Sequence, residues 1–407
     1  MSRSPLAPRM ARVRPSPTAA ISDTVRALAA RGIPVINLGE GELDFDTPAP
    51  IKAAGIAAIE RGETKYTAVA GTAALKAAIA AKFRDDNGLA YAADEIIAGS
   101  GAKQLIFNAL LATVSDGDEV IVPAPYWVSY PDMVALCDGT PVIVPCRAEA
   151  GWKLTPETLA DAITPRTRWL ILNSPNNPTG AVYSEDEIAA LTAVLRDHPH
   201  VLVMADDIYE HVRHDTGFAT PAAVAPDLKD RTLTVNGVSK AYSMTGWRIG
   251  YAGGPAWLIA AMTTLQSQST SNPSSVSQAA TIAALEGSRG FMNDWLARLK
   301  TRRQIVLDMV DATDGLTCDT PEGAFYAFVG CGGLIGRRTP AGRILADDLG
   351  VATYLLEEAH VAMIHGAAFG ASPNLRIAYA VDDAQLAEAC RRIAAACGRL
   401  QAVAAAE

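Results

Sequence analysis

Lys240 is the residue whose type and position best suit covalent chemistry. It ends the run VNGVSK, directly after an apolar stretch at residues 232–235 that is typical of a buried strand. In open α/β sheets, ligands bind at the ends of the strands where such a residue would lie. A lysine partly removed from water there has a lowered pKa and can form an imine with a carbonyl group. A solvated loop lysine would fit the same position, so the interpretation depends on what surrounds it.

Two segments could hold a phosphate near this lysine. Arg248, in the run GWRIG, carries a guanidinium that can pair with phosphate oxygens through two parallel hydrogen bonds. The run GSGAK at residues 99–103 stands between an expected strand and an expected helix, where backbone N–H groups can bind an anion. It lacks the third glycine of a dinucleotide loop. A plain strand-to-helix turn is the alternative interpretation of these glycines.

Polar residues follow two further expected strands. The run NSPNNPTG at residues 173–180 is dense in Pro, Asn and Gly, as a rigid turn should be, and its amides can donate to a phenolate oxygen. The run ADDIYE at residues 205–210 places carboxylates at another strand end. A carboxylate facing a pyridine nitrogen keeps that nitrogen protonated and makes the ring an electron sink. Taken separately, the two runs would also fit an ordinary loop and a solvated strand edge.

The elements that must position these residues alternate along the middle of the chain. Short apolar runs predict strands at residues 96–98, 119–122, 140–145, 169–173, 201–205 and 232–235. Helical periodicity lies between them, for example at residues 103–114, 131–137 and 184–196. Strands that are apolar throughout are buried on both faces. The pattern therefore predicts an α/β fold with a mainly parallel sheet flanked by helices.

The two ends of the chain predict a second, smaller α+β domain. Residues 18–31 and 289–313 read as helices, residues 324–328, 361–364 and 374–379 as strands, and a last helix begins at Asp382. We expect a large domain at residues 45–295, and a small domain formed by residues 1–44 and 296–407.

Composition narrows the class of protein. The 407 residues are 49% hydrophobic and 19% charged, with a net charge of -9, which suits a compact domain and argues against nucleic-acid or membrane-surface binding. The six cysteines form no CxxC pair, so we expect free thiols and no metal site. Neither a secretory signal nor a membrane-spanning run is present in the sequence, and we expect a cytoplasmic protein.

Taken together, these residues resemble a known family. Their order and spacing are similar to those of the class I/II, fold-type I aminotransferases, which depend on pyridoxal 5'-phosphate (PLP); the set is Asn177, Asp206, Tyr209, Lys240, Arg248 and Arg376. The runs GELDFDTP, PYWVSYP, SPNNPTG and MTGWRIG further resemble the bacterial subgroup of aspartate and aspartate/prephenate aminotransferases. The resemblance covers residues 10–400 and implies a seven-stranded central sheet, a PLP cofactor and a homodimer with shared active sites.

The resemblance also implies a role for each cofactor residue. Lys240 would form the imine with PLP and carry the proton between Cα and C4′. Asp206 would pair with the pyridinium nitrogen, while Tyr209 and Asn177 would bind the 3′-oxygen. The other expected contacts are Trp127 on the ring face, Gly101, Ala102, Lys103, Ser239 and Arg248 at the phosphate, and Tyr66 at the phosphate of the neighbouring subunit. Many relatives have serine where this chain has Gly237, and glycine where it has Ala102.

The substrate residues follow in the same way. Arg376 would clamp the α-carboxylate as a bidentate fork beside the backbone of Gly41, with Trp127 and Asn177 next to the substrate. Some relatives read a second carboxylate with an arginine near residues 267–273, but this segment has no Arg or Lys. The subgroup uses a lysine after the phosphate loop and an N-terminal threonine, and Lys103 and Thr18 stand at those places.

The predicted reaction is ping-pong transfer of an amino group from aspartate or glutamate to a 2-oxo acid. Oxaloacetate, 2-oxoglutarate and prephenate all carry the second carboxylate that Lys103 could read. An aminotransferase for aromatic or neutral amino acids and a PLP-dependent C–S β-lyase remain as alternatives, because both would share the cofactor residues. A PLP-sensing transcription regulator is disfavoured, because the resemblance starts near residue 10 and the sequence is acidic.

Overall fold

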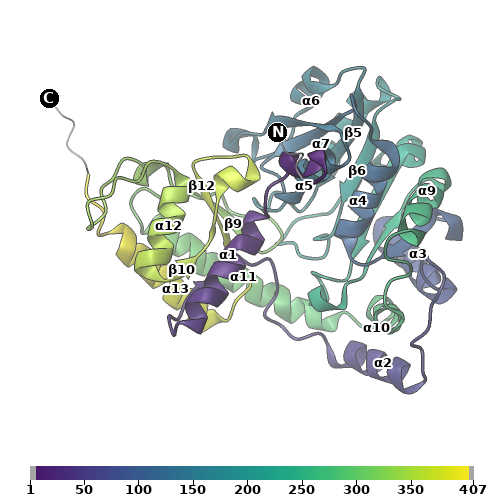
Figure 1. The fold of residues 1–407 in the computed structure, drawn as a ribbon, viewed down its shortest axis with the longest axis horizontal. Helices are drawn as coiled ribbons and strands as arrows, with labels where there is room; N and C mark the ends of the chain where they lie inside the picture. Colours follow the sequence, from purple (N-terminus) through teal and green to yellow (C-terminus); the bar gives the residue numbers. More distant parts are fainter. Residues whose placement is uncertain (1–5, 403–407) are drawn as a thin grey trace.

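The computed structural model describes residues 6–402, and within them seven strands form the central sheet (Figure 1). In spatial order they are β2 (Ile96–Gly99), β8 (Gly250–Gly253), β7 (Thr232–Gly237), β6 (Leu202–Asp206), β5 (Thr167–Asn173), β3 (Glu119–Ala124) and β4 (Thr140–Pro145). β8 runs antiparallel to both of its neighbours, and the remaining pairs are parallel. The prediction of a mainly parallel seven-stranded sheet is confirmed. β8 was not predicted, because the run GYAG has no stretch of β-branched residues.

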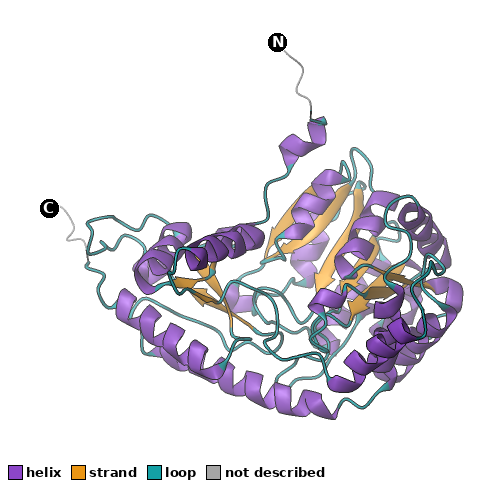
Figure 2. Cartoon of the chain, turned by 60° about the horizontal axis from the view of Figure 1, so that its bottom comes forward, coloured by secondary structure: helices purple, strands orange, loops and turns teal. Residues whose placement is uncertain are grey.

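Helices cover both faces of this sheet (Figure 2). Along β5, Trp169 and Ile171 belong to one apolar cluster, whereas Leu170 and Leu172 belong to another on the opposite face. The helices of this part are α2 (Ala49–Glu60), α3 (Ala73–Asn87), α4 (Ala102–Thr113), α5 (Ser129–Leu136), α6 (Pro156–Ala162), α7 (Glu185–Arg196), α8 (Pro221–Val224), α9 (Ala256–Ser267) and α10 (Ser275–Glu286). Of these, α2 packs mainly on α10. Burial on both faces explains why inner strands such as β5 and β6 are nearly continuous apolar runs, whereas the edge strand β4 is only partly buried.

A smaller α+β part joins the two ends of the chain, as predicted. β1 (Ile36–Asn37) pairs in parallel with β10 (Val361–Ala362), and the antiparallel sheet β11-β12-β9 lies beside it. Its other strands are β9 (Tyr326–Gly330), β11 (Ile364–His365) and β12 (Asn374–Ala378), and its helices are α1 (Pro17–Ala30), α12 (Asp348–Ala359) and α13 (Asp383–Cys397). The single strand expected at residues 361–364 is wrong, because the chain changes partner strand at Met363.

One long helix, α11 (Gly290–Asp311), runs past both parts of the molecule (Figures 1 and 2). The predicted boundary between residues 295 and 296 falls inside it, and the division into domains stays a prediction. Short 3-10 helices complete the chain: η1 (Pro8–Arg12), η2 (Ala93–Glu95), η3 (Ala148–Ala150), η4 (Pro226–Arg231), η5 (Thr245–Trp247), η6 (Gly332–Leu334) and η7 (Gly366–Phe369). Between residues 6 and 402 no helix is long and apolar enough to cross a bilayer.

Candidate active site

A cavity of about 330 Å³ lies where the ends of three central strands meet the smaller sheet. Asn173 and Asp206 are the last residues of β5 and β6, and Lys240 follows β7. Among the predicted site residues, the cavity is lined by Thr18, Gly41, Ala102, Lys103, Trp127, Asn177, Asp206, Tyr209, Ser239, Lys240, Arg248 and Arg376. Gly101 does not line the cavity but lies against the guanidinium of Arg248. The side chain of Tyr66 is 91% exposed and lies outside the cavity.

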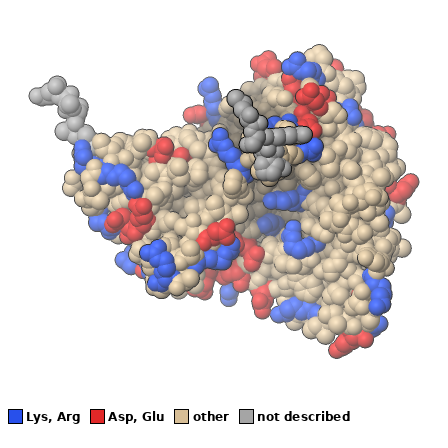
Figure 3. All heavy atoms as spheres, viewed as in Figure 1, with Lys and Arg blue, Asp and Glu red and all other residues tan. Residues whose placement is uncertain are grey.

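The ammonium group of Lys240 is held inside this cavity. Its Nζ donates a hydrogen bond to the carbonyl oxygen of Gly41, at 2.6 Å. Burial, reinforced by the nearby charge of Arg376, lowers the pKa of Lys240 to about 8. Basic side chains gather in the hollow in the middle of the face shown in Figure 3. A lysine in this environment is neutral more often than an exposed one, and only the neutral amine is a nucleophile.

Asp206 is a buried carboxylate with one oxygen unused. Tyr130 donates its hydroxyl to Oδ2 at 2.5 Å, and Oδ1 is buried without a hydrogen-bond partner. Asn173 fixes the backbone of this residue by donating to its carbonyl oxygen, at 2.8 Å. Burial raises the pKa of Asp206 to about 6, and the hydrogen bond from Tyr130 limits the rise. A protonated ring nitrogen placed at Oδ1 would supply the partner that this oxygen lacks.

The start of α4 brings free backbone N–H groups and Arg248 together. Gly101 is the N-cap residue with φ +95, and a Cβ on it would collide with the guanidinium of Arg248. Arg248 donates to the carbonyl oxygens of Ser100, at 3.3 Å, and Thr245, at 2.9 Å. The first backbone N–H groups of a helix have no partner within the helix. Together with Arg248 they suit the phosphate of PLP.

Arg376 lies fully buried at the opposite side of the cavity. Its terminal nitrogens donate to Oδ1 of Asn177, at 3.0 Å, and to the carbonyl oxygen of Gly39, at 2.5 Å. The rings of Tyr326 and Phe369 lie 4.6 and 5.0 Å from its guanidinium carbon and fix its plane. Its Nε is buried without a hydrogen-bond partner. The charge is thus held ready for a carboxylate.

Lys103 supplies a second positive charge to the cavity, next to the ring of Trp127. The Nζ of Lys103 lies 4.6 Å from the centre of the Trp127 ring. Burial and the nearby charge of Arg248 lower the pKa of Lys103. Thr18, in the first turn of α1, lines the same cavity and shares a 2.8 Å hydrogen bond with Ser16. The cavity therefore offers one buried arginine and one solvent-exposed lysine to an elongated ligand with two acidic groups.

Comparison with known proteins identifies the family. The family model for aminotransferase class I and II matches residues 33–393. The chain belongs to this family. It is 56% identical to an aspartate aminotransferase of Rhizobium meliloti, with 92% of each chain covered. It is 55% identical to an aspartate/prephenate aminotransferase of Cereibacter sphaeroides, with 97% of this chain and 99% of that one covered.

Solved structures of family members agree with this fold. The crystal structure of the Rhizobium meliloti aspartate aminotransferase matches with a TM-score of 0.95 and 53% identity, over 98% of this chain and 100% of that one. The aspartate aminotransferase of Thermus thermophilus with maleate matches with a TM-score of 0.91 and 40% identity, over 97% and 100% of the two chains. The predicted class I/II, fold-type I aminotransferase is confirmed.

Sequence reasoning missed three residues that shape the site of this aminotransferase. Tyr130 and Asn173 fix Asp206, and Tyr326 lines the cavity between Tyr209 and Arg376. Tyr130 and Asn173 stood inside motifs that were singled out, so their position next to the strand ends was an available signal. Tyr326 stood in an expected strand of the smaller part, and nothing local to it pointed to the cavity.

Proposed function

We propose that this aminotransferase binds PLP at Lys240 and moves the amino group of aspartate or glutamate to a 2-oxo acid. The observation that carries the proposal is that Lys240 and the unpartnered oxygen of Asp206 meet in one cavity with the anion site at α4. The names of the relatives support the substrate class. When bound, PLP draws electrons from the amino-acid Cα into its ring.

Each residue then has a defined task. Lys240 bonds the cofactor and afterwards accepts and returns the proton at Cα. Asp206 keeps the ring nitrogen protonated, and Tyr209 and Asn177 donate to the 3′-oxygen. Trp127 covers the ring. The phosphate is held by Gly101, Ala102, Lys103, Ser239 and Arg248.

Substrate orientation comes from the two cations at opposite sides of the cavity. Arg376 binds the α-carboxylate as a fork, with the backbone of Gly41 beside it. Lys103 and Thr18 read the distal carboxylate of aspartate, glutamate or prephenate. Acceptance of prephenate follows from the same lysine, because prephenate also carries a second carboxylate.

The absorption spectrum of the purified protein tests this function. We expect a yellow band that bleaches with L-aspartate and L-glutamate, and returns with oxaloacetate, 2-oxoglutarate or prephenate. Bleaching mainly with L-phenylalanine or L-alanine would favour an aminotransferase for aromatic or neutral substrates. Release of pyruvate and ammonia without an oxo acid would favour the β-lyase. A protein that stays colourless after addition of PLP would contradict the cofactor.

Replacing Lys103 with methionine should change specificity more than activity. The variant keeps the backbone N–H of the phosphate site and removes the charge for the distal carboxylate. We expect kcat/KM for aspartate to fall about 10- to 100-fold, the effect of one charged hydrogen bond, with little change for alanine. Arg376→Lys is the contrast, because it should impair both substrates. Equal losses for aspartate and alanine in Lys103→Met would contradict the role of Lys103.

The lowered pKa of Lys240 predicts how cofactor uptake depends on pH. Below about 8 the buried amine is protonated and cannot attack the aldehyde of PLP. The rate at which the cofactor-free protein takes up PLP should therefore rise with pH and level off above about 8. Stopped-flow absorbance measures it. A rate that continues to rise towards the ordinary lysine pKa, about 10.4, would show that burial does not act on Lys240 in this way.

We further propose a homodimer in which Tyr66 contacts the phosphate site of the neighbouring subunit. The support is its exposure: the side chain is 91% accessible on this chain. Tyrosine is enriched at protein interfaces, where its ring is covered and its hydroxyl finds a polar partner. Sedimentation equilibrium of the protein tests the assembly, and a monomer at micromolar concentration would contradict it.

A further inference from the structure

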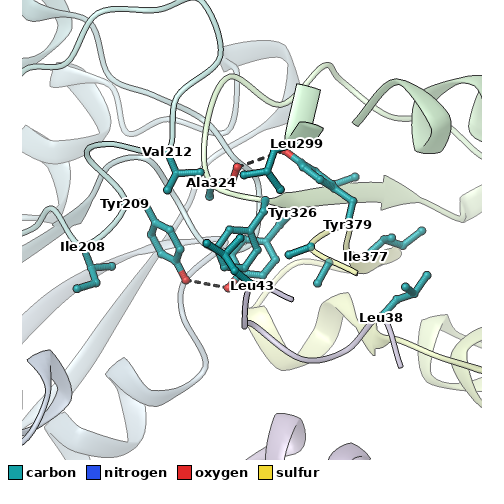
Figure 4. Packing of buried hydrophobic residues seen from close by; sticks show 14 of the residues in the cluster. Leu38, Leu43, Ile208, Tyr209, Val212, Leu299, Ala324, Tyr326, Ile377 and Tyr379 are labelled. Atoms are coloured by element: carbon teal, nitrogen blue, oxygen red, sulfur yellow. Dashed lines mark hydrogen bonds between the residues drawn. The ribbon is translucent and has the colours of Figure 1, made fainter. Parts of the chain in front are cut away.

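Tyr326 lines the cavity between Tyr209 and Arg376. Its hydroxyl shares a hydrogen bond of 2.8 Å with the hydroxyl of Tyr209, and Figure 4 shows the two phenols pointing toward each other. The guanidinium carbon of Arg376 lies over its ring, 4.6 Å from the ring centre. One side chain thus touches the tyrosine expected at the cofactor and the arginine expected at the substrate carboxylate.

Two neighbours, Tyr209 and Gly41, restrict the position of the Tyr326 hydroxyl. Tyr326 and Tyr209 are 1% and 3% exposed, and their rings pack edge to face at 5.8 Å between centres. A Cβ on Gly41 would lie 2.5 Å from the hydroxyl oxygen, so the backbone of the loop between β1 and α2 passes directly against it. The carbonyl of this same Gly41 accepts the hydrogen bond of Lys240. The hydroxyl therefore has little freedom to turn away from Tyr209.

We propose that Tyr326 is a positioning residue that acts through Tyr209. The proposal rests on the proposed function. Either phenol can donate in the shared hydrogen bond. If Tyr209 donates its hydrogen bond to an anionic oxygen of the cofactor, the Tyr326 hydroxyl becomes the donor to Tyr209. Linked hydrogen bonds polarise one another, so this donation makes Tyr209 a stronger donor.

The hydroxyl and the ring of Tyr326 then serve different partners. The hydroxyl strengthens Tyr209, which favours the anion on the cofactor oxygen and the neutral, unprotonated imine beside it. The ring supports Arg376. Removing the hydroxyl alone should change the cofactor's titration and leave carboxylate binding intact, whereas removing the ring should weaken carboxylate binding.

The test is the pH midpoint at which the lysine-bound cofactor changes colour. In Tyr326→Phe we expect this midpoint to rise by about 0.3–0.7 pH unit, the effect of part of one hydrogen bond. Tyr209→Phe should give a larger rise, and adding Tyr326→Phe to it should cause no further rise, because Tyr326 acts through Tyr209. Tyr91→Phe is the matched control, since it removes another buried phenol hydroxyl, bonded to Thr234 at 3.1 Å outside the cavity.

Two further measurements separate the possible results. Tyr326→Phe should lower kcat without raising KM for aspartate, and Tyr326→Leu should raise KM. An unchanged midpoint in Tyr326→Phe, a shift as large in Tyr91→Phe, or a full additional shift in the Tyr209→Phe background would overturn the proposal while PLP binding stands. A wild-type protein that never turns yellow with PLP would overturn the proposed cofactor, and this inference with it.

Discussion

Replacing Lys240 with alanine is expected to lower kcat by about 10⁴-fold or more. A positioned proton-transfer group contributes up to about 10⁴-fold, and Lys240 also supplies the covalent bond to PLP. PLP should then be held only by non-covalent contacts and be lost on gel filtration. After borohydride reduction, mass spectrometry should find PLP on the peptide containing Lys240 in the wild type and on no peptide of the variant.

Lys76→Ala is the matched control for this experiment. Lys76 is also a partly buried lysine that donates to a backbone carbonyl, that of Ala93 at 2.9 Å, and burial also lowers its pKa. It lies on α3, and its side chain does not line the cavity. This variant should keep its colour and turnover. Full activity in Lys240→Ala would contradict the covalent role of Lys240.

The second large effect is expected from Asp206→Asn. The amide can still accept the hydrogen bond from Tyr130, but it provides no negative charge for the ring nitrogen. Removing one preorganised electrostatic group costs about 10²- to 10³-fold in kcat, and we expect a loss in that range. The variant should also bind PLP more weakly, as measured by fluorescence titration of the cofactor-free protein.

Asp207→Asn is the matched control for Asp206→Asn. Asp207 is the adjacent buried acid, and burial holds its pKa well above the usual range, so an amide resembles its protonated form. Its side chain does not line the cavity.

The affinity of the wild type for PLP should fall as the pH drops through about 6, where Asp206 takes up a proton. Asp206→Asn should lack this step; a step that survives in the variant would show that another group causes it.

Local patterns predicted the central sheet because strands such as β3 and β5 are nearly continuous apolar runs, each followed by a helix. β8 was not predicted because it begins and ends with glycine, a residue that gives no strand signal. Glycine is needed at position 250 because a Cβ there would clash with the backbone of Ala102. The division of residues 361–365 into β10 and β11 was not predicted either. β10 pairs with β1 and β11 pairs with β12, so the division depends on strands that are far apart in the sequence.

The site was predictable where chemistry follows a strand directly. Lys240 and Asp206 stand at strand ends, and the topology of an α/β sheet brings such ends together. The roles of Arg376 and Thr18 depended on family resemblance, because they come from the smaller part and reach the cavity only through tertiary packing. Tyr326 was not found, because its importance lies in two contacts with residues far away in the sequence, Tyr209 and Arg376.

The close approach of Gly41 to the Tyr326 hydroxyl sets an order in which evolution can alter these two positions. Any larger residue at position 41 meets the oxygen at 2.5 Å, whereas the next ring atom is 3.5 Å away, an ordinary contact distance. An alanine at position 41 becomes acceptable only after Tyr326 has lost its hydroxyl, for example by becoming phenylalanine. Among descendants of this sequence, a residue larger than glycine at position 41 should therefore occur only where position 326 is no longer tyrosine.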